Sequence, residues 1–234
     1  MSAVRRFFDL QAGSIWRDLA PELKRAQGTL VDVGCGAQPY RPLLNPNVEY
    51  IGIDIADVEE RFGYAIPGTR YFDGETWPVA DASADTVLAT ETLEHVVDSA
   101  HFIQEAHRCL RPGGKLILTV PFAARWHFIP HDYWRFTPSS LALLITGGGF
   151  KEPRVYARGN ALTVAAYKTM ALVLARLLPQ KGTRAKRIAS MFVGILGVPV
   201  FVLGAVIANL SLRSTGGDDC LGYTVLAERS QEKR

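Results

Sequence analysis

The sequence is poor in cysteine and has no marked excess of charge of either sign. Its three cysteines, Cys35, Cys109 and Cys220, lie far apart and lack metal-ligand spacing, so we expect reduced thiols in a cytosolic protein. Lys and Arg total 26 against 23 acidic residues, a net charge of +3, which gives no general case for nucleic-acid binding. The composition therefore favours a reduced protein with no nucleic-acid partner.

The N-terminal region lacks the apolar core of a secretory signal, because Phe7 and Phe8 are followed at once by Asp9. Residues 3–27 instead have the pattern of one or two amphipathic helices. We expect them to cover the core, or alternatively to form a moving lid. With 234 residues, the chain suits one domain with a sizeable core and an appended segment.

Two short apolar segments each end in residues that suit ligand binding. Residues 30–33 predict a buried strand that ends in a glycine turn at 34–36, and residues 50–53 predict a second strand that ends in Asp54. In a parallel βαβ unit, such glycines let the backbone approach a ligand, and the acidic residue can bind ribose hydroxyls. We therefore expect a nucleotide-containing cofactor at this unit.

The turn lacks the third glycine of the dinucleotide fingerprint, because Pro39 occupies that position. In addition, Asp32 precedes the glycines. A pyrophosphate requires free helix N–H groups, whereas the cationic amino-acid group of S-adenosylmethionine is better served by a carboxylate. The pattern favours S-adenosylmethionine over a nicotinamide dinucleotide.

Strands and helices alternate along the rest of the chain, as in a doubly wound α/β sheet. Further strands are predicted at residues 70–73, 85–89, 115–120, 155–157 and 223–227, with helices at 92–110 and from 138 to the glycines at 147–149. The expected fold class is a Rossmann-like seven-stranded sheet with a helical hairpin inserted before the last strand.

These segments resemble the class I S-adenosylmethionine-dependent methyltransferases of the Leu-Glu-His type, over residues 28–150 and again over 222–228. The matching motifs are Asp32-Val-Gly-Cys-Gly, Asp54, Asp73, Thr-Glu-Thr-Leu-Glu-His-Val within residues 88–96, and Arg111-Pro-Gly-Gly-Lys-Leu. The resemblance implies S-adenosyl-L-methionine as cofactor and methyl transfer as the reaction. It does not identify the methyl acceptor.

Cofactor contacts are expected at the carboxyl ends of the strands, where open α/β sheets bind ligands. The expected residues are Asp32, Gly34, Cys35 and Gly36 at the methionine end, Asp54 and Ile55 at the ribose, Asp73 and Gly74 near the adenine, and Glu91 beside the cofactor. The alternative for Asp54 is a solvated carboxylate at a strand end.

An aromatic connection at residues 121–137 is the best candidate for the acceptor side. Residues 130–137, Pro-His-Asp-Tyr-Trp-Arg-Phe-Thr, resemble a signature in a branch of these enzymes often associated with bacterial glycan or lipid modification. Its mixture of a titratable base, charges and flat apolar faces suits a polyol or a sugar. The alternative is a structural latch in which Asp132 and Arg135 pair.

His131 is the first candidate for the catalytic proton acceptor, because histidine titrates near neutral pH. Asp132 or Glu94 would orient its ring, and His127 and His95 are the alternative bases. Glu94 and His95 have a second interpretation, a first-turn arrangement favoured by the helix dipole.

Two further patterns are missing. The Asn/Asp-Pro-Pro-aromatic tetrad that nucleic-acid amino methyltransferases carry after the fourth strand is replaced by Thr-Glu-Thr-Leu at residues 90–93, which disfavours methylation of adenine or cytosine. No convincing metal-ligand constellation is visible, so we expect no metal.

Residues 160–213 differ in composition from the rest of the chain. Residues 188–212 carry no charge over 25 positions, enough to cross a bilayer core, and residues 181–187 hold four cations and no acid. Because the chain must return to the sheet, and because two crossings would export the cations, we expect a hairpin that dips into one leaflet and is broken near Pro199. A soluble hairpin, a lid or an oligomer contact is the alternative.

The sequence thus predicts four parts. They are a helical cover at 1–27, a methyltransferase domain at 28–159 and 214–229, an apolar helical insertion at 160–213, and a tail at 230–234.

We expect methyl transfer to an oxygen of a membrane-associated small molecule, such as a lipid or a lipid-linked glycan, on the cytoplasmic face of a membrane. The alternatives are a catalytically silent membrane-bound interaction module and a nicotinamide-dependent oxidoreductase. The sequence specifies neither the acceptor atom nor the oligomeric state.

Overall fold

The computed structural model describes residues 1–63, 65–178, 183–214, 216 and 218–231. The chain divides into two compact units. The first comprises Met1, Ile15–Tyr156 and Gly222–Arg234, and the second comprises Ser2–Ser14 and Ala157–Leu221.

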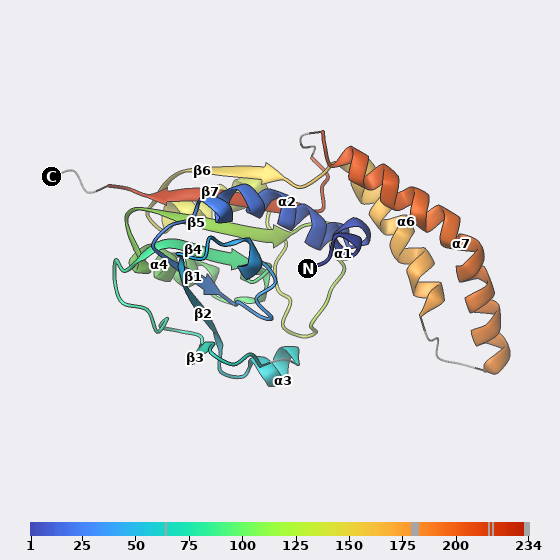
Figure 1. Ribbon diagram of the computed structural model, residues 1–234, viewed down its shortest axis with the longest axis horizontal. Coiled ribbons are helices and arrows are strands. Elements are labelled where there is room, and N and C mark those ends of the chain that lie inside the picture. Colours follow the sequence, from blue (N-terminus) through green and yellow to red (C-terminus); the bar gives the residue numbers. More distant parts are fainter. Residues whose placement is uncertain (64, 179–182, 215, 217, 232–234) are drawn as a thin grey trace. The chain divides into compact units, whose positions relative to one another are not determined.

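A seven-stranded sheet forms the centre of the first unit, in the order β3-β2-β1-β4-β5-β7-β6 (Figure 1). The strands are β1 (Thr29–Val33), β2 (Glu49–Ile55), β3 (Arg70–Phe72), β4 (Ala84–Thr90), β5 (Leu110–Pro121), β6 (Phe150–Ala157) and β7 (Gly222–Arg229). The first five strands pair in parallel, and β7 is antiparallel to β5. The predicted fold class is confirmed, and the carboxyl ends of β1, β2 and β4 meet at one edge.

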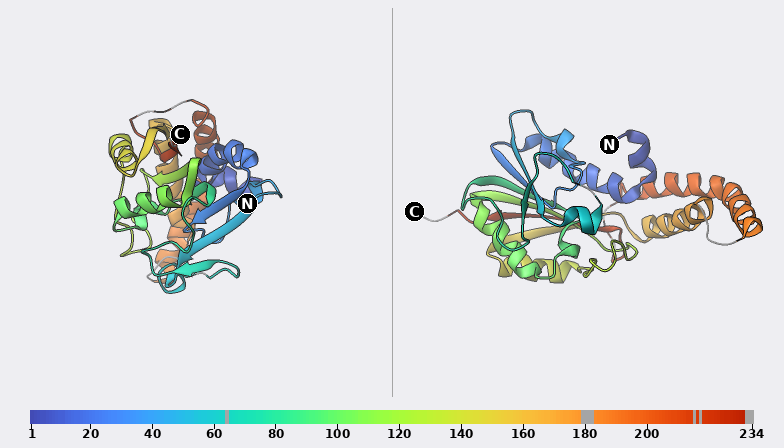
Figure 2. Two further views of the ribbon diagram at one scale, coloured as in Figure 1. Left: turned by 90° about the vertical axis from the view of Figure 1, so that its left-hand side faces the viewer. Right: turned by 90° about the horizontal axis from the view of Figure 1, so that it is seen from below.

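Helices cover both faces of this sheet. Figure 2 shows α2 (Leu10–Arg25) and α4 (Ser99–Cys109) on opposite faces. Ile15, Leu19 and Leu23 recur at helical spacing on α2 and are buried in one cluster with Leu30 of β1 and Leu88 of β4. The remaining elements of this unit are the short α3 (Val58–Phe62), α5 (Pro138–Gly147) and the 3₁₀ turns η1 (Arg41–Leu43) and η2 (Leu93–His95).

The helix expected over residues 92–110 is interrupted. The chain forms only η2 before it extends, and α4 starts at Ser99, where the Asp98 carboxylate accepts a hydrogen bond from the His101 backbone N–H at 2.9 Å. This N-cap defines the start of α4. The fifth strand also begins earlier than expected, at Leu110, which pairs with Ala84.

The second unit contains α1 (Ala3–Phe8) and the antiparallel pair α6 (Ala161–Leu177) and α7 (Arg184–Ser211). Glycines of α7 allow close packing against α6: a Cβ at Gly194 would lie 2.8 Å from the Leu177 side chain, and one at Gly197 would lie 2.9 Å from Val173. At the base of the pair, the hydroxyls of Thr163 and Ser211 are 2.6 Å apart. Close contact at small residues therefore holds the two helices together.

The break expected near Pro199 is absent, because α7 continues through this residue. Its 28 residues correspond to a length of about 42 Å at 1.5 Å per residue. Lys181, the first residue of the basic segment expected at residues 181–187, lies outside the described residues.

Candidate active site

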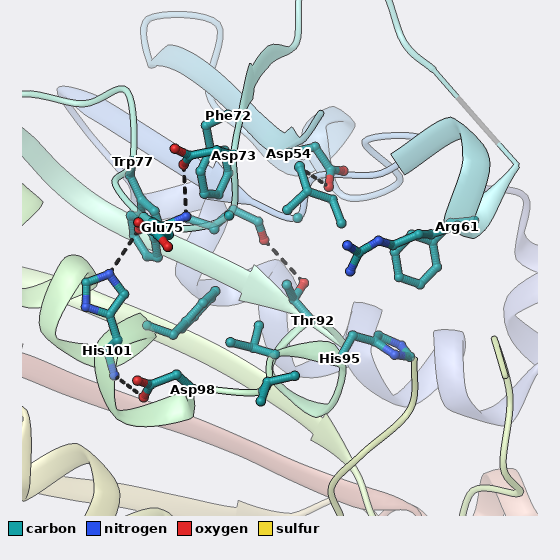
Figure 3. A pocket seen from close by; sticks show the side chains of 18 of the residues that line it. Asp54, Arg61, Phe72, Asp73, Glu75, Trp77, Thr92, His95, Asp98 and His101 are labelled. Atoms are coloured by element: carbon teal, nitrogen blue, oxygen red, sulfur yellow. Dashed lines mark hydrogen bonds between the residues drawn. The ribbon is translucent and has the colours of Figure 1, made fainter. Parts of the chain in front are cut away.

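A cavity of about 580 Å³ opens at the carboxyl edge of the sheet in the first unit (Figure 3). This volume lies in the usual range for small-molecule sites. Seven of the residues predicted from sequence line it, namely Gly34, Asp54, Ile55, Asp73, Gly74, Glu91 and His95. Asp32, Cys35, Gly36, Glu94, His131 and Asp132 are not among its lining residues.

The glycine turn and Asp54 form one hydrogen-bonded unit at the cavity wall. The Asp54 carboxylate accepts hydrogen bonds from the backbone N–H groups of Gly36, at 3.1 Å, and Ile55, at 2.9 Å. Gly34 has a φ of +64°, and a Cβ there would lie 2.4 Å from the Thr92 side chain. Each Asp54 oxygen keeps a second lone pair, which suits the two hydroxyls of a ribose.

The opposite end of the cavity combines polar backbone with flat apolar groups. The Asp73 carboxylate accepts from the Glu75 N–H at 3.0 Å, and the Glu75 carbonyl lies 3.1 Å from Nε2 of His101 (Figure 3). The rings of Trp77 and Phe102 pack edge to face at 5.0 Å beside them. Such surroundings suit a flat heteroaromatic base such as adenine.

Glu91 lies at the tip of β4 with a φ of +51°, a left-handed conformation that is uncommon outside glycine. Its N–H donates to the Thr119 carbonyl of β5 at 3.0 Å, which holds the tip in place. The bend turns the chain from β4 directly into η2, so that Glu91, Thr92 and His95 all reach the cavity.

Asp32 and Cys35 lie behind the turn rather than on the cavity wall. The Asp32 carboxylate accepts from the Tyr50 hydroxyl at 2.7 Å, while its Oδ1 is buried without a hydrogen-bond partner among the described residues. Desolvation, opposed by the Tyr50 hydrogen bond, raises the pKa of Asp32 to about 7. Burial likewise raises the pKa of the Cys35 thiol to about 12, which disfavours the thiolate form.

Glu94 and His95, at the tip of β4, contact the aromatic connection at residues 121–137, which we call the aromatic loop. Glu94 is fully buried, and its backbone carbonyl accepts the Tyr133 N–H at 2.8 Å. Nδ1 of His95 lies 2.5 Å from the His131 carbonyl, and Nε2 lies 3.7 Å from Oε1 of Glu94. Desolvation raises the pKa of Glu94 well above its ordinary value and lowers that of His95, so both groups favour their neutral forms.

The predicted pairing of His131 with Asp132 is wrong. The Asp132 carboxylate accepts two hydrogen bonds from Arg135, at 2.6 and 2.8 Å, and one from the His127 backbone N–H at 3.0 Å. Although desolvation opposes them, these donors lower the pKa of Asp132 to about 2. The Asp132–Arg135 latch is present. The histidine next to the Asp132 carboxylate is His127, whose Nδ1 lies 2.9 Å from Oδ2 of Asp132, and not His131 as expected.

Several lining residues were not anticipated from sequence. Arg61 and Phe62 come from α3, and His101 and Phe102 come from the first turns of α4. Nothing in the residues around α3 marks it as part of a site. Asp98 is a typical N-cap residue and could have indicated that a helix starts at Ser99. The apolar periodicity of residues 92–110 continues across this position, so a single helix was expected instead.

Comparison with known proteins agrees with this geometry. Residues 5–151 match a methyltransferase domain family, and the chain belongs to that family. It carries a methyltransferase domain of the class I fold, in a family whose cofactor is S-adenosyl-L-methionine. This result decides against the nicotinamide-dependent oxidoreductase.

Two curated relatives are O-methyltransferases by name. The 27-O-demethylrifamycin SV methyltransferase of Amycolatopsis mediterranei is 37% identical over 110 residues, covering 40% of this chain and 39% of the relative. The ubiquinone biosynthesis O-methyltransferase of Ruegeria pomeroyi is 29% identical over 168 residues, covering 60% and 66%. The matches thus span less than two thirds of either relative.

Solved structures share the fold at low sequence identity. A Thermotoga maritima methyltransferase, described as a possible histamine N-methyltransferase, superposes with a TM-score of 0.56 at 16% identity, covering 97% of this chain and 95% of the other. A Haemonchus contortus phosphoethanolamine N-methyltransferase, solved with S-adenosyl-L-methionine, gives a TM-score of 0.51 at 13% identity, covering 99% and 61%.

Asp54 is predicted to bind the ribose of the cofactor. Replacing it with Ala removes acceptors for two hydroxyls, which costs about 1.5–3 kcal/mol and weakens S-adenosylmethionine binding about 10- to 150-fold. Calorimetric titration of the full chain measures this affinity. Glu49→Ala, which removes an exposed carboxylate at the other end of β2, is the control and should leave the affinity unchanged. Equal affinities in folded Asp54→Ala and wild-type protein would overturn the assignment.

The raised pKa of Asp32 predicts a pH dependence of stability. In the unfolded chain this carboxyl titrates near pH 4, so between about pH 4 and its folded pKa of about 7 the folded state retains a proton that the unfolded state releases. This group therefore makes the free energy of unfolding fall as pH rises across that interval. Urea unfolding at several pH values should show a smaller fall for Asp32→Asn than for wild type. Identical profiles would mean that Asp32 is not protonated in the fold.

Proposed function

We propose that the protein methylates a hydroxyl oxygen of a membrane-associated small molecule, with a lipid or a lipid-linked glycan as the favoured acceptor. The observation that carries the proposal is the position of His95, a half-buried histidine that favours its neutral form, on the wall of the cofactor cavity and beside the aromatic loop. The exposed apolar surface of the second unit supports the membrane part of the proposal.

Oxygen as the acceptor atom fits a site of this kind. When bound, S-adenosylmethionine supplies a methyl group on a sulfonium, so the protein must mainly align the acceptor, and for a hydroxyl it must also remove a proton. Nδ1 of His95 faces the His131 carbonyl, which leaves Nε2 as the ring atom that can meet the hydroxyl. We therefore assign the role of proton acceptor to the pair His95 and His127 and not to His131. The ring centroids of His95 and His127 lie 5.1 Å apart. The two curated O-methyltransferase relatives agree with this chemistry.

The surroundings of His95 suit an acceptor with flat or apolar faces. The ring of Phe62 packs edge to face against His95 at 5.3 Å and against Phe128 at 5.1 Å. Trp126 and Trp134 are exposed on the same loop, at 61% and 44% of their surface. Aromatic faces next to hydrogen-bonding groups are what a sugar ring requires.

The hairpin of the second unit supports attachment to a membrane. Residues Arg187–Ser211 are long and apolar enough to span a bilayer. The most apolar 18 residues of this stretch have a mean hydropathy of 2.5, and 22% of them are buried. Contiguous exposed apolar surface of this size is a feature of membrane and protein interaction sites. The glycine contacts between α6 and α7 are also typical of helix pairs in lipid. We place the hairpin on the cytoplasmic leaflet, with Arg184 at the start of α7 facing anionic headgroups.

His95→Asn is predicted to lower turnover about 10²- to 10⁴-fold, because it removes the imidazole nitrogen that accepts the proton of the hydroxyl. Methyl transfer from labelled cofactor into membrane lipid extract gives the rate, and calorimetry gives the affinity for S-adenosylmethionine, which should stay within a few-fold. The matched control is His131→Asn, which keeps the backbone carbonyl that orients His95 and should change turnover only a few-fold. Turnover near that of wild type from pH 6 to 8 in His95→Asn would contradict the assignment.

The full-length protein is predicted to sediment with vesicles, and more strongly with anionic ones, since each basic residue near the surface contributes about 1 kcal/mol. Phe192→Glu combined with Leu196→Glu, at positions 64% and 74% exposed on α7, should weaken binding at least about 10-fold, because apolar burial is lost. Leu143→Glu, at a 76% exposed position of α5, is the control and should bind as wild type. A wild-type protein that stays in the supernatant without detergent and ignores vesicles would make the hairpin a lid or an oligomer contact.

A further inference from the structure

We propose that Glu94, His95 and His127 form a binding site for a divalent metal ion, with Zn²⁺ as the best-fitting ion. One ligand atom from each of these residues lies within 4.8 Å of the other two. They come from η2 and from the aromatic loop, so the site exists only once the loop has folded against the tip of β4. The role given to the metal below rests on the proposed O-methylation, whereas the binding of the metal does not.

The first observation in support of a metal ion is the buried carboxylate of Glu94. Glu94 is 0% exposed, and neither of its side-chain oxygens has a hydrogen-bond partner among the described residues. A buried carboxylate without donors is costly unless it holds a proton or a cation. Arg135 is the nearby cation, but its guanidinium makes two hydrogen bonds to Asp132 instead. The Glu94 carboxylate therefore lacks a hydrogen-bonded donor among the described residues and would be stabilised by a ligand that supplies positive charge.

The second support is the orientation of the two histidines. Nδ1 of His95 lies 2.5 Å from the His131 carbonyl, and Nδ1 of His127 lies 3.2 Å from the Arg125 carbonyl and 2.9 Å from the Asp132 carboxylate. Only a protonated Nδ1 satisfies these oxygen acceptors, so Nε2 of each ring carries the free lone pair. Metal-binding histidines are fixed in this way, by a carbonyl or carboxylate on the other ring nitrogen.

The ligand set indicates the class of ion. Two imidazoles and one carboxylate are the protein ligands of many catalytic zinc sites, which keep a further coordination position open. His95 also lines the cofactor cavity, so the open position would be reached from there. This inference departs from the metal-free site expected from sequence, because the three ligands have no recognisable spacing along the chain.

With a metal bound, Nε2 of His95 would hold the ion and could not also accept the hydroxyl proton. The ion would then replace this nitrogen as the group that makes the acceptor hydroxyl lose its proton. The hydroxyl oxygen binds the ion, its O–H bond ionises, and the proton goes to solvent. The oxygen then forms a bond to the methyl carbon while the carbon–sulfur bond breaks, and the electron pair stays on sulfur. The products are the methyl ether, S-adenosylhomocysteine and one proton, and the charge on the ion does not change.

The competing explanation needs no metal. A protonated Glu94 would share its proton with Nε2 of His95, 3.7 Å from Oε1, and the cluster would be an acid–base pair. Metal titration separates the two explanations directly.

The experiment uses the full-length protein, stripped with a chelator and titrated with Zn²⁺ alone or with Co²⁺ alone. Co²⁺ is included because its visible absorption reports its ligands. We expect one equivalent to bind to wild type and to raise the midpoint of thermal unfolding. Glu94→Gln and His127→Asn should each weaken binding by at least about 100-fold. His131→Asn, a histidine of the same loop outside the ligand set, should bind as wild type.

Affinity for S-adenosylmethionine, measured on every variant, shows that each is folded. If Glu94→Gln does not fold, the Co²⁺ spectrum of wild type and its loss in His127→Asn carry the test. Wild type that binds neither ion, or binding that is equal in all variants, overturns the proposal and leaves the acid–base pair.

The two proposals can fail separately. Loss of methylation on chelation, with recovery on addition of Zn²⁺, supports the catalytic role of the metal. Methylation of lipid extract that continues unchanged in the stripped enzyme overturns that role but leaves the O-methyltransferase assignment standing. Tight Zn²⁺ binding without methylation of any hydroxyl would overturn the proposed function but leave the metal site standing.

Discussion

The parallel pairing of β1 between β2 and β4 is the constraint on which the rest of the site depends. Val33 pairs with Ile53 on one side and with Ala89 on the other, so the three strands end at the same level. The glycine turn, Asp54 and Glu91 therefore meet at one edge, although they are far apart in sequence. The Asp54 carboxylate then ties this edge together by accepting hydrogen bonds from the N–H of Gly36 in the turn and from the N–H of Ile55 in β2. Cofactor binding thus follows from strand register.

The aromatic loop, on the proposed acceptor side, is held by a second set of contacts that includes the Asp132 carboxylate. The Glu94 carbonyl and the Asp132–Arg135 pair fix the aromatic loop against the tip of β4. The same contacts bring His95 and His127 together and place His131 in a supporting position. An ion pair that looked like an alternative to catalysis is thus the framework that positions the histidines. The structural role of Asp132 and Arg135 is therefore compatible with a catalytic role of the histidines that they position.

The apolar hairpin is compatible with this arrangement because of the position of β7. This last strand is antiparallel to β5 and lies between β5 and β6, so the chain can leave after β6 and return without disturbing the parallel part of the sheet. The excursion makes its own contacts, through glycines of α7 and the Thr163–Ser211 pair. An insertion at this point can acquire a membrane role while the cofactor site remains as it is.

The sequence by itself determined the features that depend on local pattern. Apolar runs predicted all seven strands, and the spacing from the glycine turn to Asp54 predicted the cofactor edge, because a βαβ unit links that spacing to a shared edge. Only the tertiary structure decided which groups face one another. The partner of Asp132, the place of Arg61 and the meeting of Glu94 with His127 depend on how a loop and two helices fold over the sheet. The lengths of two helices also differ from the sequence prediction. Helix α7 continues through Pro199. The single helix expected over residues 92–110 is replaced by η2 and by α4, which starts after the Asp98 cap. Periodicity records which side of an element is buried, whereas contacts between distant elements depend on the path of the whole chain.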